Sequence, residues 1–471
     1  MTFDSIIFFI FFVIILLLYH CISNWYRRKI ILLIGSYFFY AIWNPPYVLL
    51  LFFSTIFTWG VGNKLILSED PKKRKLLLFL GLVGTLGVLA FFKYSFFLLE
   101  NLISILSSVG IHYQPPVLDI LLPIGISFYT FQALSYVLDC YRRTQKEPES
   151  LTDFALYVSF FPQLVAGPIV RTGEFIPQCK DPRSVTFSHF GWGIFLLILG
   201  LFMKVVLADA FLAPVVDKIY TSYLNINAVD TWVGVFAYSG QIYFDFAGYS
   251  TCAIGVAMCF GFGLPDNFRY PYAAIGFSEF WKRWHISLSR WMRDYLYISI
   301  GGNKEGKSKE YRNLFMTMLI AGLWHGASWL FVLWGGLHGI FLVIEHVIKK
   351  RISLRFMPDF ILSNFLIAIT FLVVTLTWIP FRSPDVFVAV NILTSLFGND
   401  NASLTGMLER IEVIVIISLL FIWQLFMKHR DIESVIASRH WVIRGLLLAV
   451  LLISVVLVEG GDNRAYIYFQ F

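Results

Sequence analysis

The first apolar stretch of the sequence reads Ile6-Ile-Phe-Phe-Ile-Phe-Phe-Val-Ile-Ile-Leu-Leu-Leu-Tyr19 and contains no charged side chain. Mainly apolar stretches recur along the whole chain, at 76–92, 193–207, 360–378, 411–426 and 446–458. Such stretches approach the length at which a helix crosses roughly 30 Å of hydrocarbon, where the backbone must satisfy its own hydrogen bonds. They predict an all-α polytopic integral membrane protein with about eleven to thirteen crossings.

The composition supports this fold class. Hydrophobic residues make up 58% of the 471 residues, and charged residues only 14%. The apolar stretches run from one end of the chain to the other and leave no segment for a soluble domain. We therefore expect one membrane-embedded domain over residues 1–471. The five cysteines form no C-x-x-C pair, so neither a disulfide framework nor a metal site is indicated.

Basic clusters mark several loops between the apolar stretches. The positive-inside rule places such loops in the cytoplasm. The first cluster, Arg27-Arg-Lys29, follows the first apolar stretch, so the N-terminus is expected outside the cytoplasm. The clusters at 349–351 and 428–430 fit cytoplasmic turns and leave the C-terminus outside as well. Arg142 and Arg143 fit this count only if the stretch 76–108 makes one net crossing. The other clusters lie at 72–75, 349–351 and 428–430. The net charge of +7 therefore indicates membrane topology and not nucleic-acid binding.

An aromatic and basic segment at 277–295 precedes the later crossings. Its aromatic residues fall at helical spacings of three, four and seven, which predicts a helix lying in the membrane interface with its tryptophans in the headgroup zone. Those tryptophans are Trp281, Trp284 and Trp291, and the basic residues around them are Lys282, Arg283, Arg290 and Arg293. Two interpretations stay open: an anchor on anionic membrane lipids, or a basic mouth for a phosphate-bearing cytoplasmic donor such as coenzyme A.

His325 is the candidate catalytic residue. It lies in Ala321-Gly-Leu-Trp-His-Gly-Ala-Ser-Trp329, within an apolar run where an ionisable side chain is costly unless it faces a protein interior or a wet cavity. Burial disfavours the imidazolium, so a neutral imidazole would be available as a base. Gly322 and Gly326 flank it, and Gly335 and Gly339 repeat the spacing, which lets helices approach closely. The alternative is a packed, hydrogen-bonded core histidine, the role we expect for His338 and His346.

One formal motif is set aside. Gly301-Gly-Asn-Lys-Glu-Gly-Lys-Ser308 matches the phosphate-loop pattern, but that loop requires a preceding strand within a βαβ unit. The signatures of zinc hydrolases and serine esterases are also missing. A solvated turn is the favoured interpretation of 301–308.

Three motifs resemble those of the membrane-bound O-acyltransferases. They are Phe280-Trp-Lys-Arg-Trp-His-Ile-Ser-Leu-Ser289, Arg293-Asp-Tyr-Leu-Tyr-Ile298 with Gly301-Gly-Asn303, and Gly322-Leu-Trp-His-Gly-Ala-Ser-Trp329. Within that family the likeness is to the bacterial branch that O-acetylates alginate or peptidoglycan. Supporting segments span most of the chain from about residue 120, at 122–132, 139–142, 160–169, 244–249 and 466–471.

The resemblance implies a helical bundle with a central tunnel in the bacterial inner membrane. His325 matches the family's principal catalytic histidine, and His285 matches a second histidine toward the cytoplasmic side. Acetyl-CoA is the implied donor substrate, with no permanently bound cofactor. His325 would either take the proton of an attacking hydroxyl or first accept the acyl group. The further candidates for the tunnel wall are Trp324, Ser328, Trp329, Gln132 and Asp245.

The acceptor implied by the resemblance is an extracytoplasmic polysaccharide. The longest loop expected on that side, around 398–405, is too short to fold into a polysaccharide-binding domain, so a separate extracytoplasmic acetyltransferase is the expected partner. A transporter or flippase is the rival interpretation, because buried histidines and broken helices suit it equally, although no matching pair of interrupted helices is evident. A lipid-binding scaffold would explain the aromatic residues but not the cluster around His325.

Overall fold

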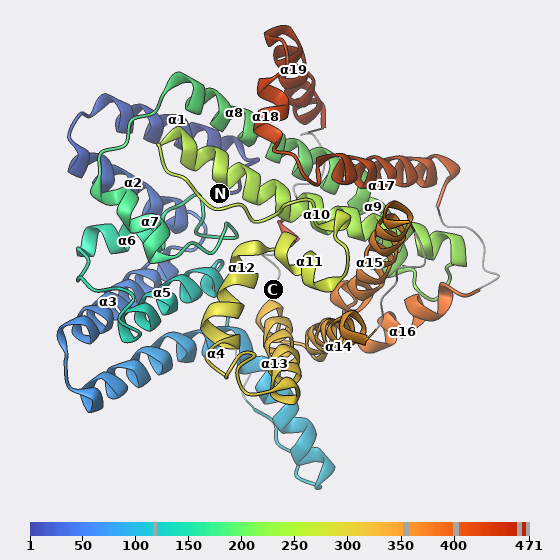
Figure 1. Ribbon diagram of the computed structural model, residues 1–471, viewed down its shortest axis with the longest axis horizontal. Coiled ribbons are helices and arrows are strands. Elements are labelled where there is room, and N and C mark those ends of the chain that lie inside the picture. Colours follow the sequence, from blue (N-terminus) through green and yellow to red (C-terminus); the bar gives the residue numbers. More distant parts are fainter. Residues whose placement is uncertain (116–119, 352–357, 399–404, 459–463, 468–471) are drawn as a thin grey trace. The chain divides into compact units, whose positions relative to one another are not determined.

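The computed structural model describes residues 1–115, 120–351, 358–398, 405–458 and 464–467, and every regular element in these ranges is a helix (Figure 1). The all-α prediction is therefore confirmed. Part of the loop around 398–405 and the last four residues, which the sequence analysis singled out, lie outside the described residues, as do the side chains of Lys350 and Arg351.

The helices occur in the following order: α1 (Ile6–Cys21), α2 (Trp25–Ala41), α3 (Pro45–Leu67), α4 (Pro71–Ser108), α5 (Ile126–Tyr141), α6 (Leu151–Ser159), α7 (Thr172–Lys180), α8 (Phe187–Leu201), the π-helical η1 (Phe202–Leu212), α9 (Ala213–Thr221), α10 (Ala228–Cys259), the 3-10 turn η2 (Pro271–Ala273), α11 (Phe277–Arg283), α12 (Ile286–Trp291), the π-helical η3 (Met292–Tyr297), α13 (Lys307–His325), α14 (Trp329–Arg351), α15 (Asp359–Arg382), α16 (Val386–Ser395), α17 (Met407–Met427), α18 (Ile432–Ala437) and α19 (Trp441–Val458).

Eight helical segments in the described ranges are long and apolar enough to cross a membrane, and α1 and α16 are shorter apolar helices. The eight are fewer than the eleven to thirteen crossings expected from the apolar stretches. Their outward faces carry exposed aliphatic side chains, for example Leu446 and Leu457 on α19, which are 62% and 79% exposed. Such faces suit a hydrocarbon solvent and confirm a polytopic membrane protein.

The chain packs as two units. Unit 1 comprises Met1–Ile194 and Ala253–Pro265, and unit 2 comprises Phe195–Cys252 and Asp266–Phe471. Two helices, α8 and α10, run from one unit into the other. Whether the membrane domain acts as one functional body, as the sequence analysis expects, stays a prediction.

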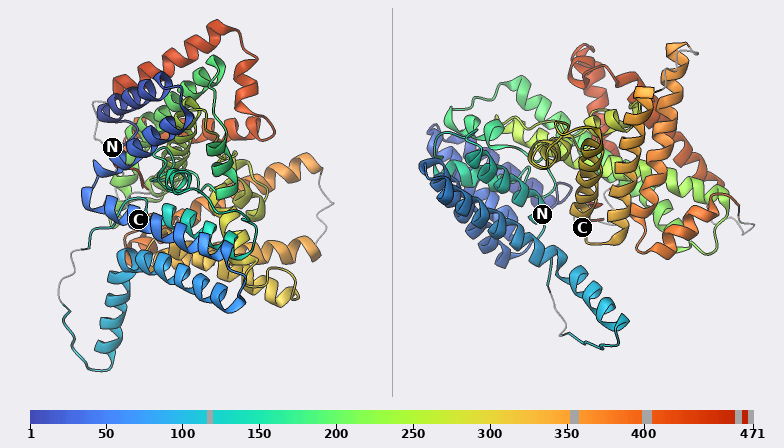
Figure 2. Two further views of the ribbon diagram at one scale, coloured as in Figure 1. Left: turned by 90° about the vertical axis from the view of Figure 1, so that its left-hand side faces the viewer. Right: turned by 60° about the horizontal axis from the view of Figure 1, so that its bottom comes forward.

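Unit 1 is built on α1 to α7. Helices α2 and α3 form a hairpin, and Pro45 begins α3, because a proline is tolerated in the first turn of a helix. The stretch 76–108 lies in one continuous helix, α4, whose C-terminal half extends beyond its neighbours α3 and α5 (Figure 2). A continuous helix can cross the membrane once at most, which agrees with the single crossing that the topological count for Arg142 and Arg143 requires. Inside the unit, Lys29 and Asp153 form a buried ion pair.

Unit 2 has an aromatic core that holds the candidate site. Its largest fully buried side chains include Trp284, Trp334 and Trp378, from the α11–α12 segment, α14 and α15. Their rings contact one another, with centroids 5.0 Å apart for Trp284 and Trp378 and 5.6 Å apart for Trp334 and Trp378. Aromatic rings at such distances pack favourably beyond their burial.

The prediction of one interfacial helix over 277–295 is wrong. The segment breaks at His285 into α11 and α12, and η3 follows. The three tryptophans are buried within the protein and do not face lipid: Trp281, Trp284 and Trp291 are 9%, 0% and 6% exposed. Helical spacing of aromatic residues marks a buried face, but it does not distinguish a face buried in lipid from one buried in protein. Of the basic residues, Lys282, Arg290 and Arg293 are exposed and Arg283 is partly buried.

Candidate active site

His325 is the last residue of α13. Gly326 follows with extended backbone, and the chain reverses through Ala327 and Ser328 into α14. The Ser328 hydroxyl accepts a hydrogen bond from the backbone N–H of Leu330 at 3.3 Å, which supports the first turn of α14. The motif that carries the histidine is thus the turn of a helical hairpin, and the His325 side chain is 2% exposed.

Glycines bring the two arms of this hairpin together. A β-carbon on Gly322 would overlap the carbonyl oxygen of Phe331 and lie 3.0 Å from the Cα of Gly335. A β-carbon on Gly335 would in turn overlap the carbonyl oxygen of Met318. The predicted role of these glycines in close helix packing is confirmed at this crossing. The crossing fixes where α13 ends, and so where His325 lies.

Aromatic rings surround His325. The ring centroids of Trp324 and Trp334 are each 5.0 Å from that of His325, and the centroid of Phe381 is 5.5 Å away. The Trp334 ring stands at 90° to the imidazole. These contacts exclude water around the imidazole and strengthen electrostatic interactions in its neighbourhood.

His285 lies in the same cluster. Its ring centroid is 6.3 Å from that of His325 and 5.9 Å from that of Trp324, and its side chain is fully buried. It occupies the break between α11 and α12 with φ 43, a left-handed conformation that few non-glycine residues adopt. The structure therefore brings together the two histidines identified by the family resemblance. Burial lowers the pKa of His285 to about 3, so its imidazole is neutral at physiological pH.

His285 is held by the neighbouring segment. Its Nδ1 lies 3.1 Å from Oδ1 of Asn267, and the same oxygen accepts a hydrogen bond from the Ser287 hydroxyl at 2.9 Å. Phe246 of α10 meets the His285 ring edge to face, with centroids 4.7 Å apart. Strained backbone that is fixed from several sides is typical of functional sites. Sequence reasoning missed Asn267, although it belongs to the polar stretch just before the basic segment.

The other two histidines on α14 lie apart from this pair. His338 Nε2 is 3.0 Å from the Thr377 hydroxyl, and its ring packs against Trp281 and Trp334. His346 Nδ1 is 2.9 Å from the carbonyl oxygen of Leu342 on its own helix. These contacts are those of packed, hydrogen-bonded histidines, the role expected for both.

The four predicted donor-binding cations differ in their surroundings. Arg283 donates to Glu279 at 2.8 Å and also to the carbonyl oxygen of Lys428 at 3.4 Å. Arg293 pairs with the neighbouring Asp294 at 2.6 Å. In both cases a carboxylate offsets the positive charge. Lys282, Arg290 and Arg293 are exposed, whereas Arg283 is partly buried.

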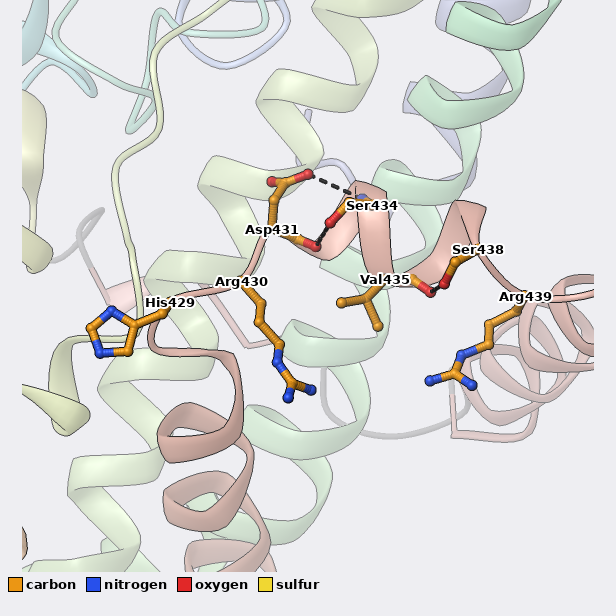
Figure 3. Close-up of a pocket in the computed structure, with 7 residues that line it drawn as sticks. All are labelled: His429, Arg430, Asp431, Ser434, Val435, Ser438 and Arg439. Atoms are coloured by element: carbon orange, nitrogen blue, oxygen red, sulfur yellow. Dashed lines mark hydrogen bonds between the residues drawn. The ribbon is translucent and has the colours of Figure 1, made fainter. Parts of the chain in front are cut away.

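A surface pocket of about 430 Å³ lies at the turn between α17 and α18, next to Lys428. Figure 3 shows the Arg430 and Arg439 side chains on one side of this turn and the Asp431 carboxylate directed away from them. That carboxylate accepts from the backbone N–H of Ser434 at 3.1 Å. Neither arginine is paired with a carboxylate in the described part of the chain. Arg283, the last residue of α11, donates to the carbonyl oxygen of Lys428, which directly precedes the first lining residue of the pocket, His429.

The remaining predicted tunnel residues have varied surroundings. Trp324 contacts both histidines. Trp329, by contrast, is 61% exposed and lies outside the cluster. Gln132 is buried in unit 1. Asp245 forms a buried ion pair with Lys204 at 2.6 Å.

Lys204 was also missed, because it interrupts a stretch that otherwise reads as an apolar crossing. Besides Asp245, its ammonium contacts Asp209 at 2.9 Å and the carbonyl oxygen of Ala465 at 3.4 Å. It also lies 4.4 Å from the ring centroid of Tyr466. A buried charge needs such partners. These contacts tie residues 465 and 466 to η1 within unit 2.

Comparison with known proteins places these features in a family. The model of the membrane-bound O-acyltransferase family matches residues 80–382, which include both histidines and the α13–α14 hairpin. The chain belongs to the membrane-bound O-acyltransferase family. The family resemblance described from the motifs is therefore confirmed, and the protein is a membrane acyltransferase.

Several relatives are similar over most of this membrane O-acyltransferase. It is 36% identical over 458 residues, 92% of each chain, to the probable alginate O-acetylase AlgI of Pseudomonas putida. It is 41% identical over 359 residues to the protein of that name from Pseudomonas aeruginosa, covering 76% of this chain and 67% of the relative. The peptidoglycan O-acetyltransferase of Helicobacter pylori is 37% identical over 391 residues, covering 77% and 72%.

Proposed function

We propose that this membrane O-acyltransferase takes an acetyl group from cytoplasmic acetyl-CoA and passes it across the bacterial inner membrane for O-acetylation of an extracytoplasmic polysaccharide. The observation that carries the proposal is the pairing of His285 and His325, with ring centroids 6.3 Å apart in a dry aromatic cluster. The relatives' names, alginate O-acetylase and peptidoglycan O-acetyltransferase, support acetyl as the group transferred.

The proposed chemistry uses His325 as a general base. Its imidazole takes the proton of an acceptor hydroxyl while the hydroxyl oxygen attacks the thioester carbonyl carbon. The C–S bond then breaks, and the imidazolium returns its proton to the leaving thiolate. The products are an O-acetyl ester and free coenzyme A. We assign the base role because it needs a single acyl transfer, whereas an acyl-imidazole route needs two.

The proposed donor site is the cationic surface formed by Lys282 and Arg290 together with the α17–α18 pocket. Coenzyme A carries a diphosphate and a 3′-phosphate, which require charge-assisted donors. Arg430 and Arg439 present two guanidiniums on one side of that pocket, and guanidiniums bind phosphate bidentately. The thioester arm would then reach the histidines while the nucleotide stays at the surface.

The proposed topology has both termini outside the cytoplasm, as the basic clusters suggest. Membrane lipids surround the exposed apolar faces of the helices. The proposed acceptor is a polymer such as alginate or peptidoglycan, and a separate extracytoplasmic acetyltransferase completes its modification.

The experiment incubates membranes from expressing cells with radiolabelled acetyl-CoA and measures label transferred to envelope polymer. His325→Ala should lower the rate by about a hundredfold or more, because a positioned base contributes on this scale. His346→Ala is the matched control, a histidine on α14 bonded to its own helix, and it should transfer label at the wild-type rate. An unchanged rate in His325→Ala membranes would exclude His325 as the base.

A further inference from the structure

Asn267 is the centre of a buried hydrogen-bond network beside His285. It is 1% exposed, and its Nδ2 donates to the Ser250 hydroxyl of α10 at 3.2 Å. Its Oδ1 lies 3.1 Å from His285 Nδ1, 2.9 Å from the Ser287 hydroxyl and 3.3 Å from the Ser287 backbone nitrogen. One side-chain oxygen thus contacts three polar groups of the His285 segment.

The hydrogen-bond partners of the Asn267 side chain show which end of the amide is the oxygen and which is the nitrogen. The two ends of an asparagine amide must be assigned from their partners. A backbone N–H can only donate, so the end of Asn267 that faces the Ser287 N–H must be the oxygen. An amide oxygen has lone pairs and no hydrogen. His285 Nδ1 must therefore carry the proton that it shares with this oxygen.

The backbone of Asn267 fixes the His285 segment as well. The Asn267 carbonyl oxygen accepts a hydrogen bond from the Ile286 N–H at 2.9 Å, and the Arg269 N–H donates to the Arg283 carbonyl oxygen at 2.9 Å. These two bonds flank His285 and hold its left-handed backbone. Side chain and main chain of one residue therefore set both the direction of the imidazole and the site of its proton.

We propose that Asn267 is a positioning residue that holds His285 as the Nδ1–H tautomer, which leaves Nε2 as its single proton-accepting atom. In a neutral imidazole with a protonated Nδ1, Nε2 carries the lone pair. His285 then accepts a hydrogen bond or proton during acyl transfer and does not donate to the thioester carbonyl oxygen. The role of Nε2 as an acceptor during acyl transfer rests on the proposed function, whereas the assignment of the proton to Nδ1 does not.

The direct test is magic-angle-spinning NMR of the full chain in lipid bilayers, with histidine isotope-labelled at both ring nitrogens. The difference between spectra of wild type and His285→Gln isolates the His285 signals from those of the other histidines. We expect a protonated Nδ1 and a bare Nε2. A protonated Nε2 in the wild type would overturn the proposal, whatever the enzyme's activity.

Variants at Asn267 separate positioning from packing. Asn267→Leu removes the acceptor, and we expect a mixed or reversed tautomer together with a fall in kcat of about tenfold or more and little change in KM. Asn267→Asp keeps an acceptor at the same place and should keep the Nδ1–H tautomer and most of kcat. Ser287→Ala removes a hydroxyl from the same oxygen and should leave the tautomer unchanged.

Two outcomes contradict the proposal: an unchanged tautomer in folded Asn267→Leu, or equal losses of kcat in the Asp and Leu variants. If Asn267→Leu does not fold, the wild-type and Asn267→Asp spectra still decide the question. Because the NMR readout needs no acyl transfer, an active His325→Ala enzyme would defeat the proposed function without affecting the tautomer result.

Discussion

His285 and His325 reach one aromatic cluster by different structural routes. His325 ends a long helix at a glycine, whereas His285 occupies a left-handed break between two short helices. Both side chains are almost entirely buried. At this scale the protein uses local backbone geometry, and not a continuous helical face, to bring two polar groups together in an apolar interior.

The burial of His285 predicts a pH dependence of stability. Burial lowers its pKa from 6.5 to about 3 in the folded state, while the unfolded chain keeps the ordinary value. Between these values the unfolded state binds more protons, so stability is complete above about pH 6.5 and falls as the pH drops toward 3. Moving from pH 7 to pH 5 should therefore cost about 2 kcal/mol from this residue.

The measurement compares thermal unfolding in detergent at pH 7 and pH 5. Wild type should lose more stability than His285→Gln over this interval, because glutamine does not titrate. Equal losses in the two proteins would mean that His285 is not held neutral by burial.

At the scale of elements, the α13–α14 hairpin positions His325 through its glycine crossing. Gly335→Ala should push the two helices apart, since its β-carbon would overlap the Met318 carbonyl oxygen. We expect a loss of about 1–3 kcal/mol in unfolding free energy and a fall in kcat. The neighbouring Gly336→Ala is the matched control, because its β-carbon would meet only the Phe315 ring at 3.9 Å. Similar unfolding temperatures for the two variants would contradict the account of the crossing.

The donor surface predicts an effect on binding and not on chemistry. Removing both charges in Lys282→Gln/Arg290→Gln, or in Arg430→Gln/Arg439→Gln, should raise KM for acetyl-CoA about fivefold at low salt with kcat unchanged. Lys72→Gln removes an exposed cation from unit 1 and serves as the control. If KM is unchanged in both double variants, the phosphates of the donor bind elsewhere.

The helices also show which features of the fold and site could be predicted from the sequence and which could not. The helical fold follows from the apolar stretches. The candidacy of His325 follows from its place in one of these stretches together with the family motif, and its catalytic role stays a prediction. The break at His285 could not be predicted, because the spacing of Trp281, Trp284 and Trp291 fits a continuous helix. The partners Asn267 and Lys204 could not be found by periodicity, since each meets residues far away in the chain.

The whole chain combines an apolar exterior with a few buried polar networks. In unit 2 one such network joins Lys204 to Asp245 and to the segment 464–467, where the Ile467 N–H donates to Asp245 at 3.0 Å. Removing one partner of such a buried ion pair leaves the other charge uncompensated in the protein interior, which lowers the stability of the fold. A second network, centred on Asn267, holds His285. Both lie in the part of the protein that carries the proposed chemistry.

The central claim concerns the direction of transfer: an acetyl group from the cytoplasmic side is transferred to the outer side at a site where buried His325 is the base. The most direct measurement uses sealed membrane vesicles of both orientations, with radiolabelled acetyl-CoA added only outside. Inverted vesicles should accumulate label on polymer inside the lumen, right-side-out vesicles should not, and His325→Ala should abolish the signal. Equal labelling in the two orientations, or unchanged labelling with His325→Ala, would contradict the account.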